Sequence, residues 1–368
     1  MTVASTFMRR PYATATSGDR VDILGDVSPR VGLMVAALGM SFVSACGGGQ
    51  RAGSTTSGCD RGTAIEGRAL RVATTVAPLT SIVANIAGGS GTEVTGLVPE
   101  GVSSHAYEPS PSVAATLEHA DVVFLNGLAL EEPTKALAVA NMGAGAVLCE
   151  LGTTILPESQ YIYDFSFPES GGDPNPHLWT NPPMAGAYAH LVHDVLVRVD
   201  PEHADVYDAN LTAFTDRVDA LDGALRDASA TIPADQRMLL TYHDAYAYFA
   251  REYGWTIVGA IQPSSFDEPT PRDVARLIDQ IQAKHVPAVF GSEVFPSPVL
   301  EQIAAETGAR YVDDLRDDDL PGEAGDAGHS WLGLMRFDYT TIVEALGGDA
   351  SELRALDVSD VSADAAQY

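Results

Sequence analysis

The chain has 368 residues, of which 45% are hydrophobic, so it is long enough for two domains of ordinary size with buried cores. It has 21 Lys and Arg against 50 Asp and Glu, which gives a formal net charge of −29. Because nucleic acids and anionic lipid headgroups are bound by basic surfaces, this charge argues against both classes of partner.

The N-terminus is predicted to be an export signal. Residues 31–45 form an uncharged apolar run preceded by four arginines, and the run is shorter than the ~20 residues that a membrane-spanning helix needs. The run ends in "VSAC", which resembles a bacterial lipobox; an ordinary signal peptide with a coincidental cysteine is the alternative. We expect residues 1–46 to be a lipoprotein signal peptide, with Cys46 as the lipid attachment residue and only membrane contact. The Gly/Ser/Thr-rich residues 47–67 are expected to be a flexible tether.

The three cysteines, Cys46, Cys59 and Cys149, form neither a disulfide framework nor a spacing typical of metal sites. A single bridge between Cys59 and Cys149 outside the cytoplasm is an alternative to two free thiols.

Residues 68–183 are predicted to form an N-terminal lobe in which strands and helices alternate. Ser110 followed by Pro111 is typical of a helix start. Strands are expected at 70–79, 92–99 and 121–127, and helices at 80–89 and 111–120. This alternation at short intervals predicts a parallel sheet covered on both faces.

Residues 231–350 are predicted to form a C-terminal lobe with the same pattern. Strands are expected at 237–243, 255–261, 287–294 and 309–315, and helices at 245–254, 272–285 and 296–308. "DEPTPRDVARL" in this lobe repeats the helix opening "YEPSPSVAATL" of the first, which predicts an internal repeat; a shared helix-start signature is the alternative. The acidic residues 351–368 are expected to be a disordered tail.

Residues 184–230 are expected to be connecting helices, because they contain almost no helix breaker and their apolar residues recur at helical spacing. The last thirty or so residues would form one long helix spanning ~45 Å. The predicted fold class is therefore α/β: two related lobes, each with a small parallel sheet flanked by helices, joined by one long rigid helix.

Three of the nine histidines fall where ligands bind in open α/β sheets, at or beyond the carboxyl ends of strands. His105 follows the second predicted strand, His177 lies in the Pro-rich loop "DPNPHLWTNPP", and His243 ends a strand of the second lobe. Asp313, at the end of the last strand, is a fourth candidate. Three imidazoles and one carboxylate suit a first-row divalent ion such as zinc. These residues are far apart in sequence, so their spacing is not a metal motif by itself.

Six segments, in order, resemble the zinc/manganese solute-binding lipoproteins of metal ABC transporters. They are "HAYEPSPS", "PHLWTNP", "YHDAYAYFAREYG", "EPTPRDV", "YVDDL" and "LMRFDYTTIVEALGG", within residues 68–348. The resemblance implies two α/β lobes, one rigid linking helix, and one ion per chain buried between the lobes. It also implies delivery of that ion to a membrane permease.

The resemblance places the family's metal ligands on His105, His177, His243 and Asp313, with Asp314 the less favoured neighbour of the last. Histidine at the third position favours zinc, with manganese as the alternative. Two departures leave the choice of metal open: Val113 stands where the family usually has Asp, and no His-rich loop precedes His177. Tyr107, Glu108, Trp179 and Asp314 are candidates for residues supporting the ligands.

The function predicted from the sequence is therefore capture of a divalent metal outside the cytoplasm by a monomeric, lipid-anchored protein. An enzyme is not expected, because four protein ligands leave no obvious open position for a reactive water and no hydrolase motif occurs. The alternatives are a manganese-specific protein of the same family and, in another class, a secreted zinc hydrolase that uses three of these ligands. A binding protein for an organic or chelated ligand is a further alternative.

Overall fold

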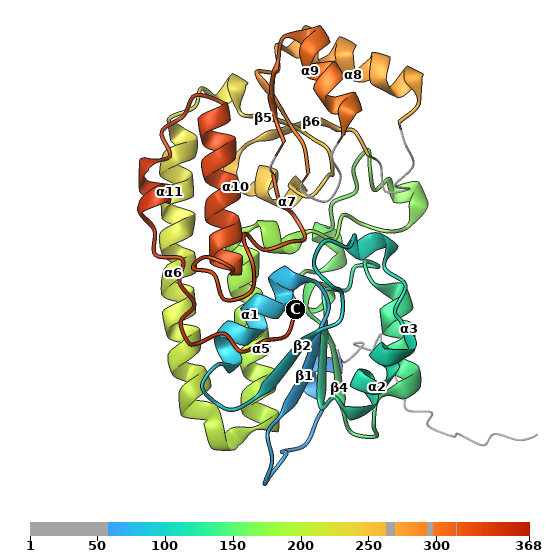
Figure 1. Ribbon diagram of the computed structural model, residues 1–368, viewed down its shortest axis with the longest axis vertical. Helices are drawn as coiled ribbons and strands as arrows, with labels where there is room; N and C mark the ends of the chain where they lie inside the picture. Colours follow the sequence, from blue (N-terminus) through green and yellow to red (C-terminus); the bar gives the residue numbers. More distant parts are fainter. Residues whose placement is uncertain (1–57, 263–268, 293–296, 314) are drawn as a thin grey trace, which may run out of the picture. The chain divides into compact units, whose positions relative to one another are not determined.

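The computed structural model describes residues 58–262, 269–292, 297–313 and 315–368, all within one compact unit that spans residues 55–368. Two four-stranded parallel sheets, each with its own helices, lie in this unit (Figure 1). This confirms the predicted fold class. Cys46, the predicted signal peptide, the first part of the predicted tether and Asp314 lie outside the described residues.

The first sheet has the strand order β2-β1-β3-β4. Its strands are β1 (Arg71–Thr74), β2 (Glu93–Gly96), β3 (Val122–Leu125) and β4 (Val147–Glu150). The helices of this lobe are α1 (Ala77–Ala87), α2 (Pro111–His119), α3 (Glu132–Asn141) and α4 (Leu151–Ile155). The strand expected over 70–79 is shorter than predicted, because Pro78 lies in the first turn of α1, where its fixed backbone angle favours a helix start.

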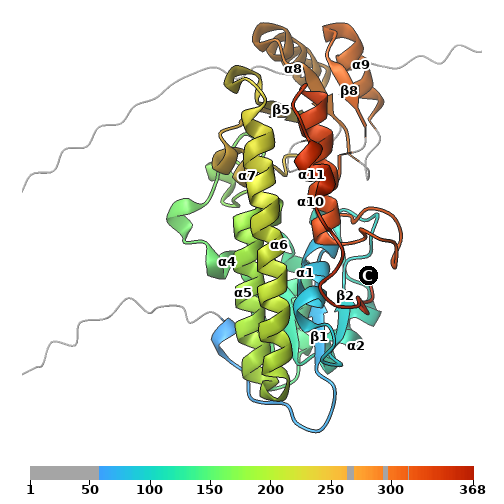
Figure 2. The same cartoon turned by 90° about the vertical axis from the view of Figure 1, so that its left-hand side faces the viewer.

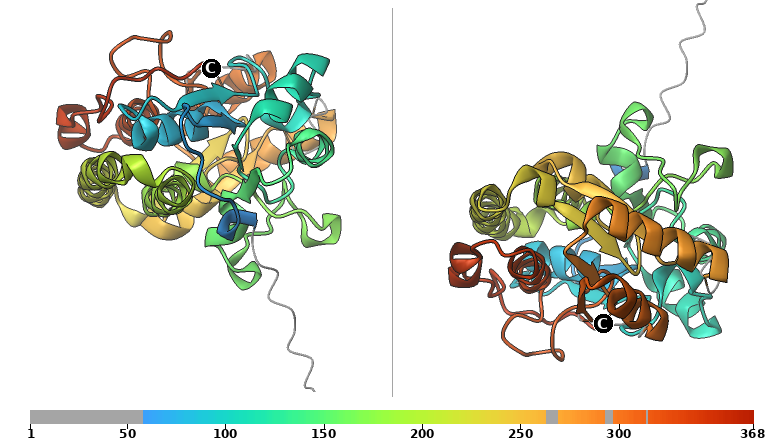
Figure 3. Two further views of the ribbon diagram at one scale, coloured as in Figure 1. Left: turned by 90° about the horizontal axis from the view of Figure 1, so that it is seen from below. Right: turned by 90° about the horizontal axis from the view of Figure 1, so that it is seen from above.

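Both faces of the first sheet are buried. In β3, Val122 and Phe124 face the larger apolar core, while Val123 and Leu125 face a second cluster that includes Val113 of α2. Figure 3 shows α1, α5 and α6 on one side of this sheet and α2 and α3 on the other. A strand buried on both faces is apolar throughout rather than alternating, as "VVFL" is.

The second sheet has the order β6-β5-β7-β8, which is the order of the first sheet. Its strands are β5 (Met238–Thr241), β6 (Thr256–Ala260), β7 (Ala288–Phe290) and β8 (Arg310–Val312). Its helices are α7 (Ala247–Tyr253), α8 (Pro271–Lys284) and α9 (Pro298–Thr307). The repeated helix opening occupies equivalent places: Pro111 begins α2 and Pro271 begins α8. The shared strand order supports the predicted internal repeat.

Long helices run beside the two sheets, and α5 and α6 lie side by side along their length (Figure 2). They are α5 (Pro182–Val199) and α6 (Ala204–Ala230), and α10 (Trp331–Ala345) and α11 (Ser351–Ala355) pack against α6. At 27 residues, α6 is about 40 Å long. Its predicted apolar stripe is buried at Phe214, Val218, Leu221 and Leu225. Within the described residues, no helix has the length and apolar character needed to cross a bilayer.

Short 3-10 helices occupy several connections, and two of them carry residues of the candidate site. They are Gly58–Asp60, Ser104–Ala106, Glu158–Gln160, Glu169–Gly171, Leu178–Thr180, Pro201–His203 and Ala234–Gln236.

The C-terminal residues, for which the sequence predicted disorder, are folded. After α11 the chain crosses to the first lobe, where the Gln367 N–H donates to the Val94 carbonyl (3.0 Å) and the Gly96 N–H donates to the Gln367 carbonyl (2.6 Å). The Tyr368 ring packs edge-on against His329 at a centroid distance of 4.9 Å. β2 is an edge strand, and its outer backbone groups are available to pair with this segment. The composition of the C-terminal residues alone does not indicate this pairing.

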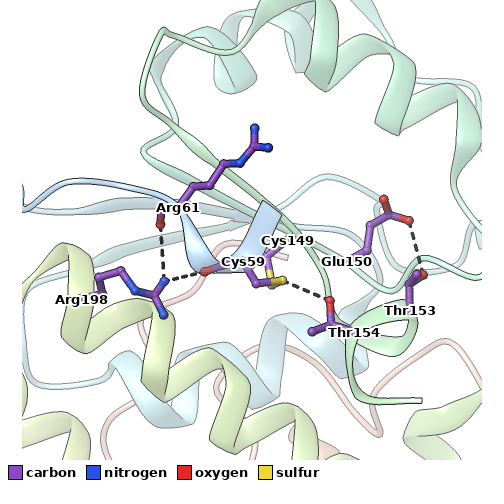
Figure 4. The surroundings of a disulfide bond; sticks show 7 residues. All are labelled: Cys59, Arg61, Cys149, Glu150, Thr153, Thr154 and Arg198. Carbon is purple, nitrogen blue, oxygen red and sulfur yellow. Dashed lines mark hydrogen bonds between the residues drawn. A yellow bond between two sulfur atoms is a disulfide. The ribbon is translucent and has the colours of Figure 1, made fainter. Parts of the chain in front are cut away.

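A disulfide between Cys59 and Cys149 attaches the start of the described chain to β4 (Figure 4). Arg198 of α5 donates to the Cys59 carbonyl, and the Thr154 hydroxyl lies 3.3 Å from the Cys59 sulfur. Cys59 and Cys149 are both buried. Of the two alternatives left open by the sequence, the structure therefore has the bridge. Residues 58–67 of the predicted tether are fastened here and at Ile65, whose N–H donates to the Val199 carbonyl.

The disulfide closes a loop of 90 residues, for which chain entropy predicts a large contribution to stability. Replacing both Cys59 and Cys149 by Ala should lower the free energy of unfolding by about 3 kcal/mol, measured by guanidinium denaturation. Treating the unmodified protein with a reductant should shift its denaturation midpoint toward that of the variant. Equal midpoints with and without reductant, together with two titratable thiols in the denatured protein, would show that the bridge does not form.

Candidate metal centre

His177 is fixed by its own Pro-rich loop. It is fully buried, and both its backbone N–H and its Nδ1 lie within hydrogen-bond distance of the Asn175 Oδ1, at 3.1 and 2.9 Å. The Asn175 side-chain amide in turn donates to the Asp244 carbonyl (2.9 Å), next to His243. Since an amide oxygen only accepts, the hydrogen-bond network assigns the His177 proton to Nδ1. This tautomer leaves the Nε2 lone pair as a ligand.

The other two predicted histidines both approach the Nε2 atom of His177. It lies 3.1 Å from His105 Nε2 and 2.9 Å from His243 Nε2. In a tetrahedral zinc site with Zn–N bonds of 2.0–2.1 Å, ligand nitrogens lie about 3.3 Å apart. The two distances to His177 Nε2 are therefore already close to the spacing that one ion requires, and potential ligand atoms of all three histidines lie within 4.8 Å of one another. His105 comes from the 3-10 helix after β2, and His243 comes directly after β5.

Two carboxylates lie beside the imidazoles. Asp317 Oδ2 is 3.6 Å from His243 Nε2, and potential ligand atoms of His177, Asp317 and Asp318 lie within 4.8 Å of one another. Asp318 is buried, and its Oδ2 accepts hydrogen bonds from the Ser104 N–H (3.2 Å) and hydroxyl (2.7 Å). The Asp318 Oδ1 has no hydrogen-bond partner. The segment after β8 thus contributes oxygen atoms to the site, and one of them is a buried, unused acceptor.

The structure does not bring Asp313 into either of these groups. Asp313 is exposed, directly after β8, whereas the chain turns inward only later, between the buried Leu315 and Leu320. In this structure Asp317 and Asp318, rather than Asp313, lie beside the histidines, and Asp313 as a ligand stays a prediction. The stretch "DDLRDDDL" has five acidic residues, and the first after the strand was chosen because ligands gather at strand ends. Leu315 and Leu320, which flank Asp317 and Asp318, were the sequence signal that this part of the stretch is buried.

The predicted supporting residues divide into one that touches the site and two that lie beside it. Trp179 is fully buried; its Nε1 donates to the Asp317 carbonyl (2.9 Å), and its ring packs edge-on against His177 at 5.1 Å. Tyr107 packs on the apolar cluster under α2, and burial raises its pKa. Glu108 is exposed. Asn175, Ser104 and Asp318, which hold the histidines or their loops, were not singled out from the sequence.

Burial keeps the imidazoles neutral. It lowers the pKa of His105 and His177 well below the ordinary value, and a charge on a neighbouring histidine would lower each further. Burial lowers the pKa of His243 to about 4. The Asp318 carboxyl is affected in the opposite sense: burial raises its pKa to about 6, against the stabilising hydrogen bonds from Ser104. Neutral imidazoles with available lone pairs are the form that binds a metal ion.

Residues 72–345 match the family model ZnuA, described as "Zinc-uptake complex component A periplasmic". This range contains both sheets except Arg71, the first residue of β1, and every residue of the candidate centre.

Similar proteins carry names that refer to three different metals. The chain is 30% identical over 277 residues to the "Iron-binding protein YfeA" of Yersinia pestis, covering 75% of this chain and 86% of that protein. It is 30% identical over 289 residues to the "Manganese-binding lipoprotein MntA" of Halalkalibacterium halodurans, covering 78% and 92%. The solved structure of the periplasmic zinc-binding protein TroA of Treponema pallidum superposes with a TM-score of 0.69 at 26% identity, covering 76% and 99%.

The lowered pKa of His243 predicts that the metal-free protein is destabilised by acid. In the unfolded chain this histidine is protonated below pH ~6.5. In the folded chain it stays neutral until the pH falls to about 4. The free energy of unfolding should therefore decrease as the pH is lowered from ~6.5 to about 4, and this histidine should account for up to about 3 kcal/mol of the decrease. Urea denaturation of chelator-treated protein at several pH values measures it.

His243→Asn is the matched control for the pH effect, because Asn retains polarity without titrating. Its free energy of unfolding should depend less on pH between ~6.5 and 4 than that of the unmodified protein. The comparison is needed because Asp318, with its raised pKa, acts with the opposite sign between ~4 and 6. Identical pH slopes in both proteins would contradict the prediction.

Proposed function

The chain belongs to the family of periplasmic zinc-uptake components, and from this membership we propose that it captures one divalent transition-metal ion outside the cytoplasm and delivers it to the permease of an ABC transporter. The observation that carries the proposal is the convergence of His105, His177 and His243 at Nε2–Nε2 distances of 3.1 and 2.9 Å. Imidazole nitrogens this close either share a proton or share a cation. Burial disfavours the charged imidazolium forms, so the three rings stay neutral and their nitrogens remain able to bind a cation in place of a shared proton.

The metal would be held by three imidazole nitrogens and carboxylate oxygen from the segment after β8. Asp318 would bind through Oδ1 while Ser104 holds its Oδ2, and Asp317, fixed by Trp179, would complete the oxygen side. Zinc is the ion we propose, because a nitrogen-rich set binds it more tightly than manganese. Manganese is the alternative, and relatives named for iron, manganese and zinc show that this family serves several ions.

The place of action is outside the cytoplasm. A lipid anchor at Cys46, which lies outside the described residues, would hold the protein at the membrane surface. We propose that the protein binds the metal ion as a monomer. The Cys59–Cys149 disulfide supports an oxidising compartment, where such bonds persist. The family consists of transport proteins, and we propose that this chain has no enzymatic activity, because its protein ligands would occupy the positions that a catalytic ion keeps for water.

Titration of metal-free protein tests the proposed function. Zinc should bind at one ion per chain by elemental analysis and calorimetry, more tightly than manganese. His105→Ala should weaken zinc binding by at least about 100-fold, because one of three imidazole ligands is lost. Acid should release the ion, since the imidazoles must stay neutral to bind. A protein that binds neither ion, or that hydrolyses ester or phosphate substrates in a manner abolished by His243→Ala, would contradict the proposal.

The choice of carboxylate is tested by three matched substitutions. Asp318→Asn and Asp317→Asn should each weaken zinc binding, by about 10- to 100-fold for the group that touches the ion. Asp313→Asn removes the same charge at an exposed position of the same segment and should leave the affinity nearly unchanged. If Asp313→Asn weakened zinc binding and the other two substitutions did not, Asp313 would be the carboxylate ligand.

A further inference from the structure

The candidate metal centre has an opening at one of its three histidines. His177 and His243 are buried, whereas His105 is partly exposed and lines a pocket of about 240 Å³. Besides His105, the pocket is lined by two groups of residues: Leu128, Ala129 and Leu130, and Phe167, Pro168, Gly171, Asp173, Pro174 and Pro176. A hydrated ion that reaches this pocket meets His105 before it meets the two buried ligands.

Phe167 stands between the pocket and the buried imidazoles. Its ring lines the pocket and lies 5.9 Å, centroid to centroid, from both His105 and His177. The side chain is 6% exposed, so it covers the histidines rather than extending into solvent. An apolar ring in this position excludes water from the ion and must move when a hydrated ion passes.

The turn that presents Phe167 is held by one carboxylate. Asp164 Oδ1 accepts hydrogen bonds from the Ser166 and Phe167 backbone N–H groups, both at 2.9 Å, and Asp164 Oδ2 accepts from the Asn175 side chain (3.1 Å). Asn175 is also the residue that orients His177. The backbone of the turn is thus tied to the metal centre, so a movement that opens the pocket toward the histidines would fall to the Phe167 side chain.

Asp173 places a negative charge at the mouth of the pocket. It lines the pocket and is exposed, and it is the acidic residue among the pocket walls. A divalent cation is attracted to such a charge over about a Debye length, which raises the rate of association at low ionic strength.

We propose that this pocket is an outer binding site for the hydrated ion and its route to the histidines, with Asp173 as the capturing charge and Phe167 as the side-chain gate. This inference rests on the proposed function. It deepens that function by naming the residues that control how fast the ion enters and leaves, as distinct from those that hold it.

Two pairs of variants separate gating from other effects of the same loop. Phe167→Ala is matched by Phe165→Ala, since Phe165 lies two residues away in the same loop but is 52% exposed. Asp173→Asn is matched by Glu169→Gln, which removes the same charge from an exposed residue of the same loop that does not line the pocket. Trp179, 5.1 Å from His177, offers a fluorescence signal for the ion in stopped-flow mixing.

Phe167→Ala should speed both zinc association and chelator-induced zinc dissociation by about tenfold while changing the equilibrium constant by less than about threefold, because a gate changes rates in both directions. Phe165→Ala should leave the rates unchanged. Asp173→Asn should slow association by about two- to fivefold at low salt, an effect that disappears at high salt, whereas Glu169→Gln should have less effect.

The outcomes distinguish the gate from the function. If the unmodified protein binds no zinc, the proposed function fails and this inference with it. If zinc binds but Phe167→Ala keeps both rates, the gate is overturned. If Asp173→Asn and Glu169→Gln behave alike, the capturing role of Asp173 is overturned. If Phe167→Ala lowers the melting temperature strongly, Phe167→Leu, which keeps most of the apolar volume, replaces it and should give a smaller acceleration in both directions.

Discussion

The approach of two imidazole Nε2 atoms, of His105 and His243, to within about 3 Å of His177 Nε2 is the interaction on which the candidate site depends. In the metal-free protein these contacts are hydrogen bonds between neutral imidazoles, and the tautomer of each ring decides which nitrogen donates. The protein fixes two of these residues from outside: Asn175 and the Trp179 ring hold His177, and the Ser104–Asp318 bonds hold the loop of His105. A divalent cation would take the place of the protons that these nitrogens share, and would bind the same three neutral rings.

The scaffold around this centre is fastened across long sequence distances. The α5–α6 pair, the Cys59–Cys149 bridge and the C-terminal pairing of Gln367 with β2 all attach distant segments to the first lobe. The last attachment lies beyond residue 345, where the match to the family ends. These attachments stiffen the first lobe, which presents His105 and the pocket that Phe167 lines.

The carboxylates show how a negative protein manages charge near a cation site. Asp317 and Asp318 are buried beside the histidines, and burial raises the pKa of Asp318 to about 6. With the ion present, the carboxylate charge compensates the cation charge in a medium where unpaired charges are costly. Asp173 lies outside, in water, where its charge attracts ions without that cost. The position of an acidic residue, rather than the net charge of −29, decides which of these roles it takes.

The sequence by itself determined the alternation of strands and helices, the long linking helix and the three histidines, because each is a local pattern: apolar runs, helix-start prolines and polar residues at strand ends. Its choice of Asp313 as the fourth ligand stays a prediction. It left the Cys59–Cys149 pairing open, because that pairing depends on which residues meet in space. It also predicted disorder for residues 351–368, whose order comes from the unpaired edge of β2. Only the tertiary structure decided these matters, since burial and contact between distant segments have no periodicity along the chain.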